Sequence, residues 1–343
     1  MADAGSTAPD AARAEVMALI TAGWSTKVIH VAVTLGVPDR LAAGPRDSAG
    51  IAAETGSNPG ALRRLLRALA VLGLCRQTQE DLFELTPAGA LLRADAPGSI
   101  RGMALHWGER LWGALSQLDQ SIETGRAWKA SGEDGFLQMV RDPAQMAMFH
   151  QSMTDQTGPV ASAMLDVYDF TRFRTLMDVG GSYGALLAAI LKAHPGLQGR
   201  VFDLPGLAQA SRAYLQGAGV ADRAGFEGGS FFEAVPGGAD AYMLKLIIHD
   251  WDDERSAAIL THCRKAAGAS GKVLVMERIA PALAGTGAGD YVTIRGDIVM
   301  LTATGGLERT ERQYRDLYAE AGLSLERIVP TVSGFCVMEC SAA

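Results

Sequence analysis

One histidine and two acidic residues stand at the ends of predicted strands or in the loops that follow, where they could transfer a proton. The segment LKLIIHDWDDE contains His249, and Glu277 and Glu308 follow in KVLVMER and TGGLERT. An imidazole with a pKa of about 6.5 can take a proton at neutral pH, and a carboxylate can orient it. A hydroxyl of phenolic type titrates near pH ~10, so its deprotonation by histidine is uphill by about 3.5 pKa units unless it is concerted with the bond-forming step. Each acid alone also has a structural explanation, at a strand end or a helix N-terminus, but their joint placement favours a general base.

A second constellation, TLMDVGGSYGALL, has the order of a strand, a glycine-rich turn and a helix start. Gly180 and Gly181 permit a tight turn that brings the backbone close to a ligand. The spacing differs from the G-x-G-x-x-G of dinucleotide enzymes, so alone it is a weak signal. Asp203 ends the next predicted strand, where its carboxylate could accept both hydroxyl hydrogens of a ribose or only cap a turn. Together these residues indicate an adenosine-containing cofactor, without separating S-adenosylmethionine from NAD.

Alternating strands and helices must position both constellations. From Phe173 onward the strands TLMDV, RVFDL, AYMLKLIIH, KVLVMER, LERIVPT and GFCVMEC are predicted, with helices over 185–193, 207–216, 254–267 and 311–321. This order predicts an α/β domain with a mostly parallel sheet covered on both faces, and a short turn predicts that the last two strands pair antiparallel. Ligands bind at the carboxyl ends of such strands, so the glycine turn, the histidine and the acids should share one edge.

The N-terminal part is predicted to be helical up to a hairpin. Apolar residues recur at helical spacing over 11–37, where Pro38 should close the segment. A short helix before Gly56, a longer one over 59–72 and a hairpin in CRQTQEDLFEL complete a winged-helix pattern. A DNA-binding module needs a basic excess. Between residues 51 and 95 five basic residues are matched by five acidic ones, so packing or dimerisation is the expected role.

Composition limits the class of protein further. The chain of 343 residues is 48% hydrophobic and 20% charged, which suits an ordinary soluble protein with a sizeable core. The net charge of −7 argues against non-specific affinity for nucleic acid or an anionic membrane. No uninterrupted apolar run reaches the roughly 18 residues of a membrane span, and no signal peptide is visible. The four cysteines lack zinc-site spacing, which favours free thiols in the cytoplasm.

The order of five segments resembles a known family. DVGGSYG, FDLP, LKLIIHDWDDE, ERIAP and GGLERT are similar to the motif series of the caffeic acid O-methyltransferase-like family, which includes plant phenolic methyltransferases and bacterial enzymes of natural-product biosynthesis. The resemblance covers nearly the whole chain, and H-D-W with flanking acids is highly diagnostic. It implies a class I S-adenosylmethionine-dependent methyltransferase domain with a Rossmann-like seven-stranded sheet, and a winged-helix N-terminal dimerisation domain. It further implies a homodimer that methylates a hydroxyl of a small aromatic or polycyclic molecule without a metal.

The resemblance also implies roles for individual residues. His249 would be the base, oriented by Glu277 and Glu308. S-adenosylmethionine, with S-adenosylhomocysteine as product, would be bound by nine residues: Asp178, Gly180, Gly181, Asp203, Leu204, Ser230, Phe231, Lys245 and Trp251. Of these, Gly180 would hold the methionine part, Asp203 the ribose, Lys245 polar groups and Trp251 the adenine face. The acceptor pocket is expected to include Phe149, Met153, Trp107, Trp112 and Met300, which could otherwise be ordinary core.

Two departures and several alternatives accompany this assignment. Ser230 replaces the acid of the family's G-G-D motif, and Ser182 replaces the third glycine of the first motif. The predicted domains are dimerisation (1–100), a helical connector lining the acceptor pocket (101–170) and catalysis (171–343). The same fold could instead serve a non-methylating decarboxylase or hydroxylase. A winged-helix regulator that senses S-adenosylmethionine and an NAD-dependent oxidoreductase are further alternatives.

Overall fold

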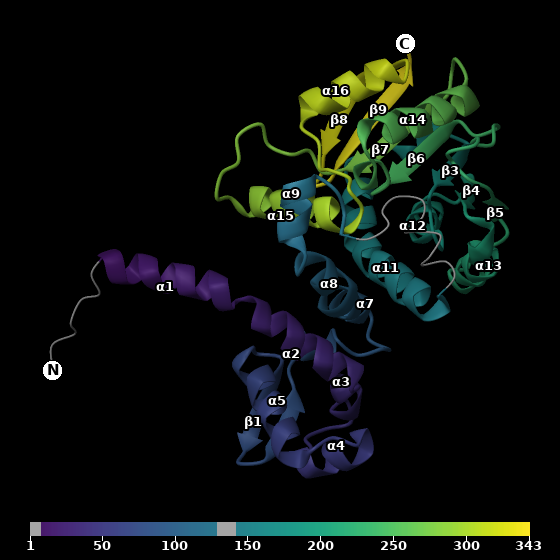
Figure 1. Ribbon diagram of the computed structural model, residues 1–343. Helices are drawn as coiled ribbons and strands as arrows, with labels where there is room; N and C mark the ends of the chain where they lie inside the picture. The colour runs from purple at the N-terminus through teal and green to yellow at the C-terminus, as the bar shows by residue number, and fades with distance from the viewer. Residues whose placement is uncertain (1–7, 129–141) are drawn as a thin grey trace. The chain divides into compact units, whose positions relative to one another are not determined.

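The computed structural model describes residues 8–128 and 142–343. The chain divides into two compact units, Met1–Trp112 and Gly113–Ala343 (Figure 1). In its described part, the first unit is helical apart from one antiparallel hairpin. Its elements are α1 (Ala8–Thr21), α2 (Gly23–Thr34), α3 (Val37–Arg40), α4 (Ser48–Thr55), α5 (Pro59–Val71), β1 (Cys75–Gln79), β2 (Leu82–Leu85), α6 (Pro87–Ala90), α7 (Arg101–His106) and the π-helical turn η1 (Trp107–Leu111).

Side-chain caps set the helix boundaries of the first unit. Asp47 and Asn58 each accept a backbone N–H three residues ahead, which starts α4 and α5. Gly56 ends α4 in the left-handed conformation, so both predicted helices are confirmed. The prediction that Pro38 closes a helix is wrong. After Gly36 turns the chain at φ 64°, Pro38 lies in the first turn of α3, where proline needs no N–H donor.

An exposed apolar surface runs along α1 and the start of α2. Val16, Leu19, Ile20 and Trp24 are all exposed, with Leu19 and Ile20 at 71% and 70%. By length and composition the helical stretch Pro9–Thr34, which covers α1 and α2, could cross a membrane, and it lies near the N-terminus. A single helix of this kind is weak evidence for a span. An apolar face left uncovered in one chain also suits burial against a partner.

The second unit contains a seven-stranded sheet in the order β5-β4-β3-β6-β7-β9-β8. The first five strands in this order are parallel, and β9 pairs antiparallel with β8, as predicted. It also pairs antiparallel with β7, which was not predicted. The strands are β3 (Thr175–Val179), β4 (Gln198–Asp203), β5 (Ala224–Gly228), β6 (Ala241–Lys245), β7 (Lys272–Glu277), β8 (Leu323–Pro330) and β9 (Cys336–Ala342). The seven strands and their order match the predicted class I methyltransferase architecture.

Helices cover both faces of this sheet (Figure 1). On one face Met164 of α11 and Leu187 of α12 pack against Leu176 of β3. On the other face, Ile259 of α14 and Tyr318 of α16 belong to a cluster that includes Met177, the neighbour of Leu176 in β3, because successive strand residues point to opposite faces. The helices of this unit are α8 (Trp112–Leu115, which begins at the boundary), α9 (Leu118–Thr124), α11 (Pro143–Leu165), α12 (Ala185–Ala193), α13 (Ala208–Gly217), α14 (Asp253–Ala267), α15 (Ala288–Ala303) and α16 (Glu311–Glu320).

The strand predicted over AYMLKLIIH is shorter than expected. β6 ends at Lys245, Leu246 adopts φ 56°, and Ile248–Asp250 form a 3-10 turn, η4. A positive φ is costly for leucine and persists only where the surroundings fix the backbone. The chain therefore leaves the sheet after Lys245, two residues before the turn that carries His249.

Candidate active site

Glu277 fixes the backbone of the loop after β6. This carboxylate is fully buried, and its Oε1 accepts the backbone N–H groups of Ile247 (3.0 Å), Ile248 (2.7 Å) and His249 (3.2 Å). Its Oε2 accepts the hydroxyl of Tyr314. Glu277 was expected to contact the imidazole directly, but its carboxylate instead binds backbone N–H groups of the loop. Three charge-assisted bonds to consecutive N–H groups explain why the chain can turn here with Leu246 at positive φ.

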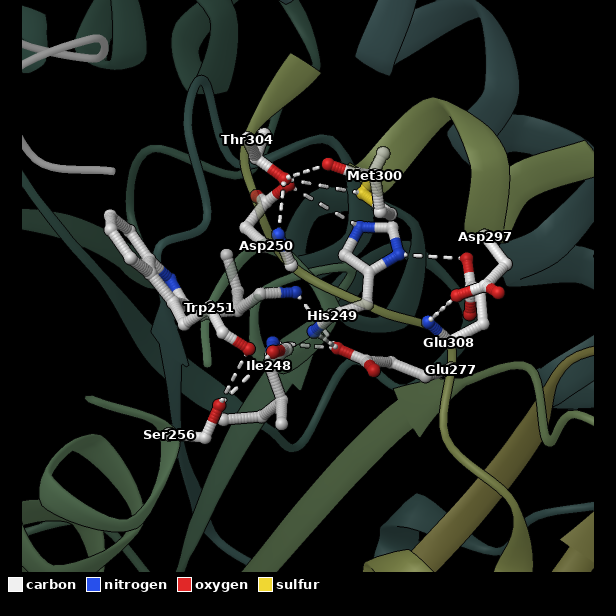
Figure 2. A network of polar contacts seen from close by, with 12 residues as sticks. Ile248, His249, Asp250, Trp251, Ser256, Glu277, Asp297, Met300, Thr304 and Glu308 are labelled. Atoms are coloured by element: carbon white, nitrogen blue, oxygen red, sulfur yellow. Dashed lines mark hydrogen bonds and ion pairs between the residues drawn. The ribbon is translucent and has the colours of Figure 1, made fainter. Parts of the chain in front are cut away.

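Glu308 contacts the imidazole itself. Its Oε1 lies 3.0 Å from His249 Nδ1, and both side chains are almost completely buried. On the other side of the ring, Asp250 Oδ1 lies 3.8 Å from Nε2, so the imidazole lies between two carboxylates (Figure 2). The backbone N–H of Glu308 donates to Asp297 Oδ1 at 2.9 Å, which anchors the acid. This geometry selects the tautomer that donates from Nδ1 to Glu308.

The loop is closed from a third direction by GGLERT. Buried Arg309 donates to the carbonyl oxygens of Ile248 (3.0 Å) and Trp251 (2.8 Å). A Cβ on Gly306 would lie only 2.0 Å from the carbonyl oxygen of His249. The glycine is therefore required for the close approach of the two loops. Main-chain contacts from both β7 and this loop leave the imidazole little freedom to move.

The carboxylates around His249 stabilise the protonated, positively charged form of its imidazole ring. Burial alone would lower the pKa of the imidazole, but the carboxylates of Glu308, Asp250 and Glu277 outweigh it and raise the pKa to about 9. Without further positive charge in the site, the ring is protonated at neutral pH. A ligand that brings a positive charge close to the ring would lower this pKa and release the neutral base.

A pocket in the second unit gathers most of the predicted ligand-binding residues. It encloses about 1100 Å³ of empty space, part of it open to solvent, at the carboxyl ends of β3, β4 and β6. The predicted residues that line it are Phe149, Met153, Asp178, Gly180, Gly181, Asp203, Leu204, Ser230, Phe231, Lys245 and Trp251.

Asp203 joins the second strand to the glycine-rich turn. Its Oδ2 accepts the backbone N–H of Ser182 and its Oδ1 that of Leu204, both at 2.7 Å. Burial raises the pKa of this carboxyl to about 6, against the opposing effect of these two hydrogen bonds. Gly180 has φ 69°, and a Cβ there would lie 2.4 Å from a side-chain carbon of Ile247. The turn thus has the close backbone approach that its glycines predict.

Comparison with known proteins assigns the family. Residues 115–324 match the O-methyltransferase domain, and residues 17–95 match the O-methyltransferase dimerisation domain. The chain belongs to this O-methyltransferase family. It is an S-adenosylmethionine-dependent O-methyltransferase, and its dimerisation domain supports the predicted homodimer.

Several relatives of this methyltransferase are bacterial enzymes named for the methylation of small molecules. It is 38% identical to the phenazine O-methyltransferase PhzM of Lysobacter antibioticus over 326 residues, covering 94% of each chain. It is 37% identical to O-demethylpuromycin-O-methyltransferase of Streptomyces alboniger, covering 96% of this chain and 89% of the relative. The structure of LaPhzM has a TM-score of 0.91 at 37% identity, covering 96% and 99% of the two chains. That of NcsB1 from neocarzinostatin biosynthesis, with S-adenosylmethionine and 2-hydroxy-5-methyl naphthoic acid, scores 0.78 at 34% identity, covering 93% and 96%.

The pocket of the methyltransferase fits its cofactor. Asp178 is buried beneath the turn, and its Oδ2 has no hydrogen-bond partner among the described residues. Burial raises the pKa of Asp178 to about 7 and, despite the attraction of nearby acids, lowers that of Lys245 to about 8. Such poorly compensated groups suit a ligand that carries both donors and a positive charge. Gly181 is needed here as well, because its Cβ would lie 2.5 Å from the Asp178 carboxyl.

Three aromatic side chains, Phe231, Phe232 and Trp251, also line the pocket. Trp251 meets Phe232 edge to face at 4.7 Å and Phe231 at 6.1 Å between ring centroids. Ser230 Oγ accepts the backbone N–H of Phe232 at 3.2 Å. The serine that replaces the family's acid is therefore engaged within its own turn. Arg255 lies 5.9 Å from the centroid of the Trp251 ring.

Several pocket residues were missed from the sequence, and some predicted ones lie elsewhere. The missed lining residues include His150, Tyr183, Phe232, Ile247 and Asp250. Asp250 could have been chosen from H-D-W itself, whereas His150 offered no signal beyond a lone histidine. The other predicted residues are not on this pocket wall: His249 and Glu277, which lie in and beneath the adjoining loop, and Glu308, Met300, Trp107 and Trp112. Trp107 and Trp112 belong to the first unit, and their part in acceptor binding stays a prediction.

Proposed function

We propose that this enzyme methylates a hydroxyl, of phenolic type, on a small aromatic or polycyclic natural product, with His249 as general base and no metal. The observation that carries the proposal is the 3.0 Å contact between His249 Nδ1 and Glu308 at the edge of the cofactor pocket. Relatives named for phenazine, puromycin and naphthoate methylation support an aromatic acceptor. Because these relatives are named methyltransferases, a non-methylating decarboxylase or hydroxylase is not favoured.

The chain's own residues prepare the proton transfer. Glu308 holds Nδ1–H, so Nε2 is the nitrogen that takes the hydroxyl proton. Glu277 and Arg309 hold the loop backbone, which fixes the position of the ring. When bound, S-adenosylmethionine supplies a methyl group on a positively charged sulfur and is left as S-adenosylhomocysteine. Positive charge in the pocket lowers the pKa of the imidazole, which makes the ring neutral at neutral pH, and lowers the pKa of an acceptor phenol, which makes its proton easier to remove.

The acceptor is proposed to lie against the helix α11. Phe149 and Met153 line the pocket from this helix, within the segment 101–170 assigned as the connector. A flat ring fits between an aromatic face and a pliable thioether. Met300 of α15 is proposed as a further wall; its Sδ lies 3.8 Å from Thr304 Oγ1 (Figure 2). Trp107 and Trp112 complete the proposed acceptor set.

The cytoplasm is the proposed location of the reaction. Cys75, Cys263, Cys336 and Cys340 are all free thiols. Free, mostly buried cysteines suit a reducing compartment. The proposed division of labour leaves residues 1–100 for dimerisation and 171–343 for catalysis.

The test replaces His249 by alanine. A general base contributes about two to four orders of magnitude, so turnover of a hydroxyphenazine or hydroxynaphthoate acceptor should fall by about that factor in kcat. S-adenosylhomocysteine affinity, measured by calorimetry, should stay nearly unchanged. His194→Ala is the matched control, because His194 follows α12 and is absent from the pocket wall. Unchanged turnover in His249→Ala would remove this histidine from the mechanism.

A further inference from the structure

His150 is a buried polar side chain in the cofactor pocket to which none of the assigned roles applies. It lies on α11, is 4% exposed and lines the pocket wall. Its Nδ1 is hydrogen-bonded to Ser182 Oγ, in the glycine-rich turn, and its Nε2 lies 2.9 Å from Met146 Sδ. The ring packs against Tyr183 with 4.5 Å between centroids. The imidazole therefore joins the acceptor helix to the cofactor turn.

The partners of the ring determine which atoms carry hydrogen. A thioether sulfur can only accept, so Nε2 carries the hydrogen that points to Met146. In a neutral imidazole the other nitrogen is then an acceptor, and Nδ1 receives the hydroxyl hydrogen of Ser182. Burial lowers the pKa of His150 to about 4, which keeps the ring neutral at physiological pH. The Ser182 hydroxyl thus donates its only hydrogen to His150, and the lone pairs of Oγ remain free to accept a hydrogen bond from a ligand.

The main chain of Ser182 is held just as firmly. Its φ of 55° is left-handed, a conformation that glycine adopts freely and serine only at a cost. Its backbone N–H donates to Asp203 at 2.7 Å. A serine at this position is compatible with the turn but not favoured by it. What the serine side chain adds at this turn, and glycine would lack, is a hydroxyl oxygen at the pocket wall whose orientation His150 sets.

We propose that His150 is a positioning residue that directs Ser182 Oγ to accept a hydrogen bond from the α-ammonium group of the methionine part of the cofactor. An ammonium group has only donors, which matches an oxygen whose hydrogen is already used. The cofactor's carboxylate needs donors and does not match it. The inference rests on S-adenosylmethionine as the cofactor and does not depend on His249 acting as the base.

The test compares two ligands on the full-length enzyme. S-adenosylhomocysteine has the ammonium group, and 5′-methylthioadenosine lacks the whole amino-acid part. Calorimetry would give both dissociation constants for wild type, Ser182→Gly, His150→Phe and the double variant. A charge-assisted hydrogen bond predicts that Ser182→Gly weakens S-adenosylhomocysteine binding about tenfold or more, with methylthioadenosine binding changed less than about twofold. Because His150 acts through Ser182, the double variant should bind no more weakly than Ser182→Gly alone.

Controls and contrary outcomes separate positioning from general damage. Gln151→Ala is the matched control, since this neighbour on α11 is exposed and its side chain donates to Asp155 within the same helix. Glycine is favoured at the φ of Ser182, so Ser182→Gly should fold even if His150→Phe does not. Unchanged S-adenosylhomocysteine affinity in Ser182→Gly overturns the proposal. Equal losses for both ligands, or additive losses in the double variant, also overturn it. Failure of the His249 test would leave these affinities untouched, so the two proposals fail separately.

Discussion

Replacing Glu308 by glutamine should move the ionisation of His249 toward acid. The carboxylate oxygen lies 3.0 Å from Nδ1. At that distance a unit charge pair is worth roughly 1.4 kcal/mol at a dielectric of ~80 and roughly 5.5 kcal/mol at ~20, which corresponds to about one to four pKa units. The substitution removes the charge and keeps the burial, which lowers the pKa. We therefore expect the His249 pKa to fall from about 9 by about two units.

The pH dependence of kcat/KM for S-adenosylmethionine reports this ionisation in the free enzyme. A general base works only when neutral, so activity should be present above the pKa of His249 and be lost as the pH falls through it. In the wild type this acid limb lies near pH 9, and in Glu308→Gln it should lie near pH ~7. The plateau above the limb should fall about tenfold or more, because an amide orients the ring less strongly than a carboxylate.

Two variants bound the interpretation. Glu311→Gln removes an acid three residues away that pairs on the surface with Arg315, and should leave the limb in place. His249→Ala should abolish the limb altogether. A limb that stays near pH 9 in Glu308→Gln, or moves to higher pH, would refute the argument that Glu308 holds the charge on the ring.

Three more predictions address the cofactor turn, the loop contact and the support beneath it. Asp203→Ala should weaken S-adenosylhomocysteine binding by about ten- to a hundredfold in calorimetry, through loss of the proposed ribose acceptor and of the turn contact. Gly306→Ala should lower kcat by at least about tenfold, since its Cβ would lie 2.0 Å from a loop carbonyl oxygen, whereas Gly217→Ala meets nothing within 4 Å and should be neutral. Tyr314→Phe should lower unfolding stability by about 1–3 kcal/mol in denaturant titration, because Glu277 loses a buried donor.

The regular part of the fold was accessible from the sequence because its signals are local. Strong β-rich runs predicted five of the strands, β3, β4, β7, β8 and β9, at nearly their observed bounds. Capping residues predicted the helix boundaries in the same way. The strand β5 was missed: AGFEG contains two glycines, lacks apolar alternation and lies at the sheet edge. The helix α15 was also missed, because its β-branched residues and Gly296 weaken helical propensity and its formation depends on tertiary packing.

The site was accessible to the extent that it depends on strand ends. The glycine turn, Asp203 and Lys245 fall on one edge because parallel strands share their carboxyl ends. The role of Glu277 could not be predicted. The binding of three N–H groups by one carboxylate depends on the folded shape of the loop, and no sequence pattern predicts it. His150 was inaccessible for the same reason, since its importance lies in a partner 32 positions away.

The charges of the site form one coupled arrangement. Without a ligand, Asp178 and Asp203 are buried carboxyls whose pKa values rise to about 7 and about 6, and His249 is held as a cation. A positive charge in the pocket stabilises the carboxylates and destabilises the imidazolium at once. Binding a cationic cofactor therefore favours ionised aspartates, and it favours the neutral histidine that the proposed mechanism needs. A neutral product reverses both effects, so the charges that would activate the proposed base would also weaken binding of the demethylated cofactor.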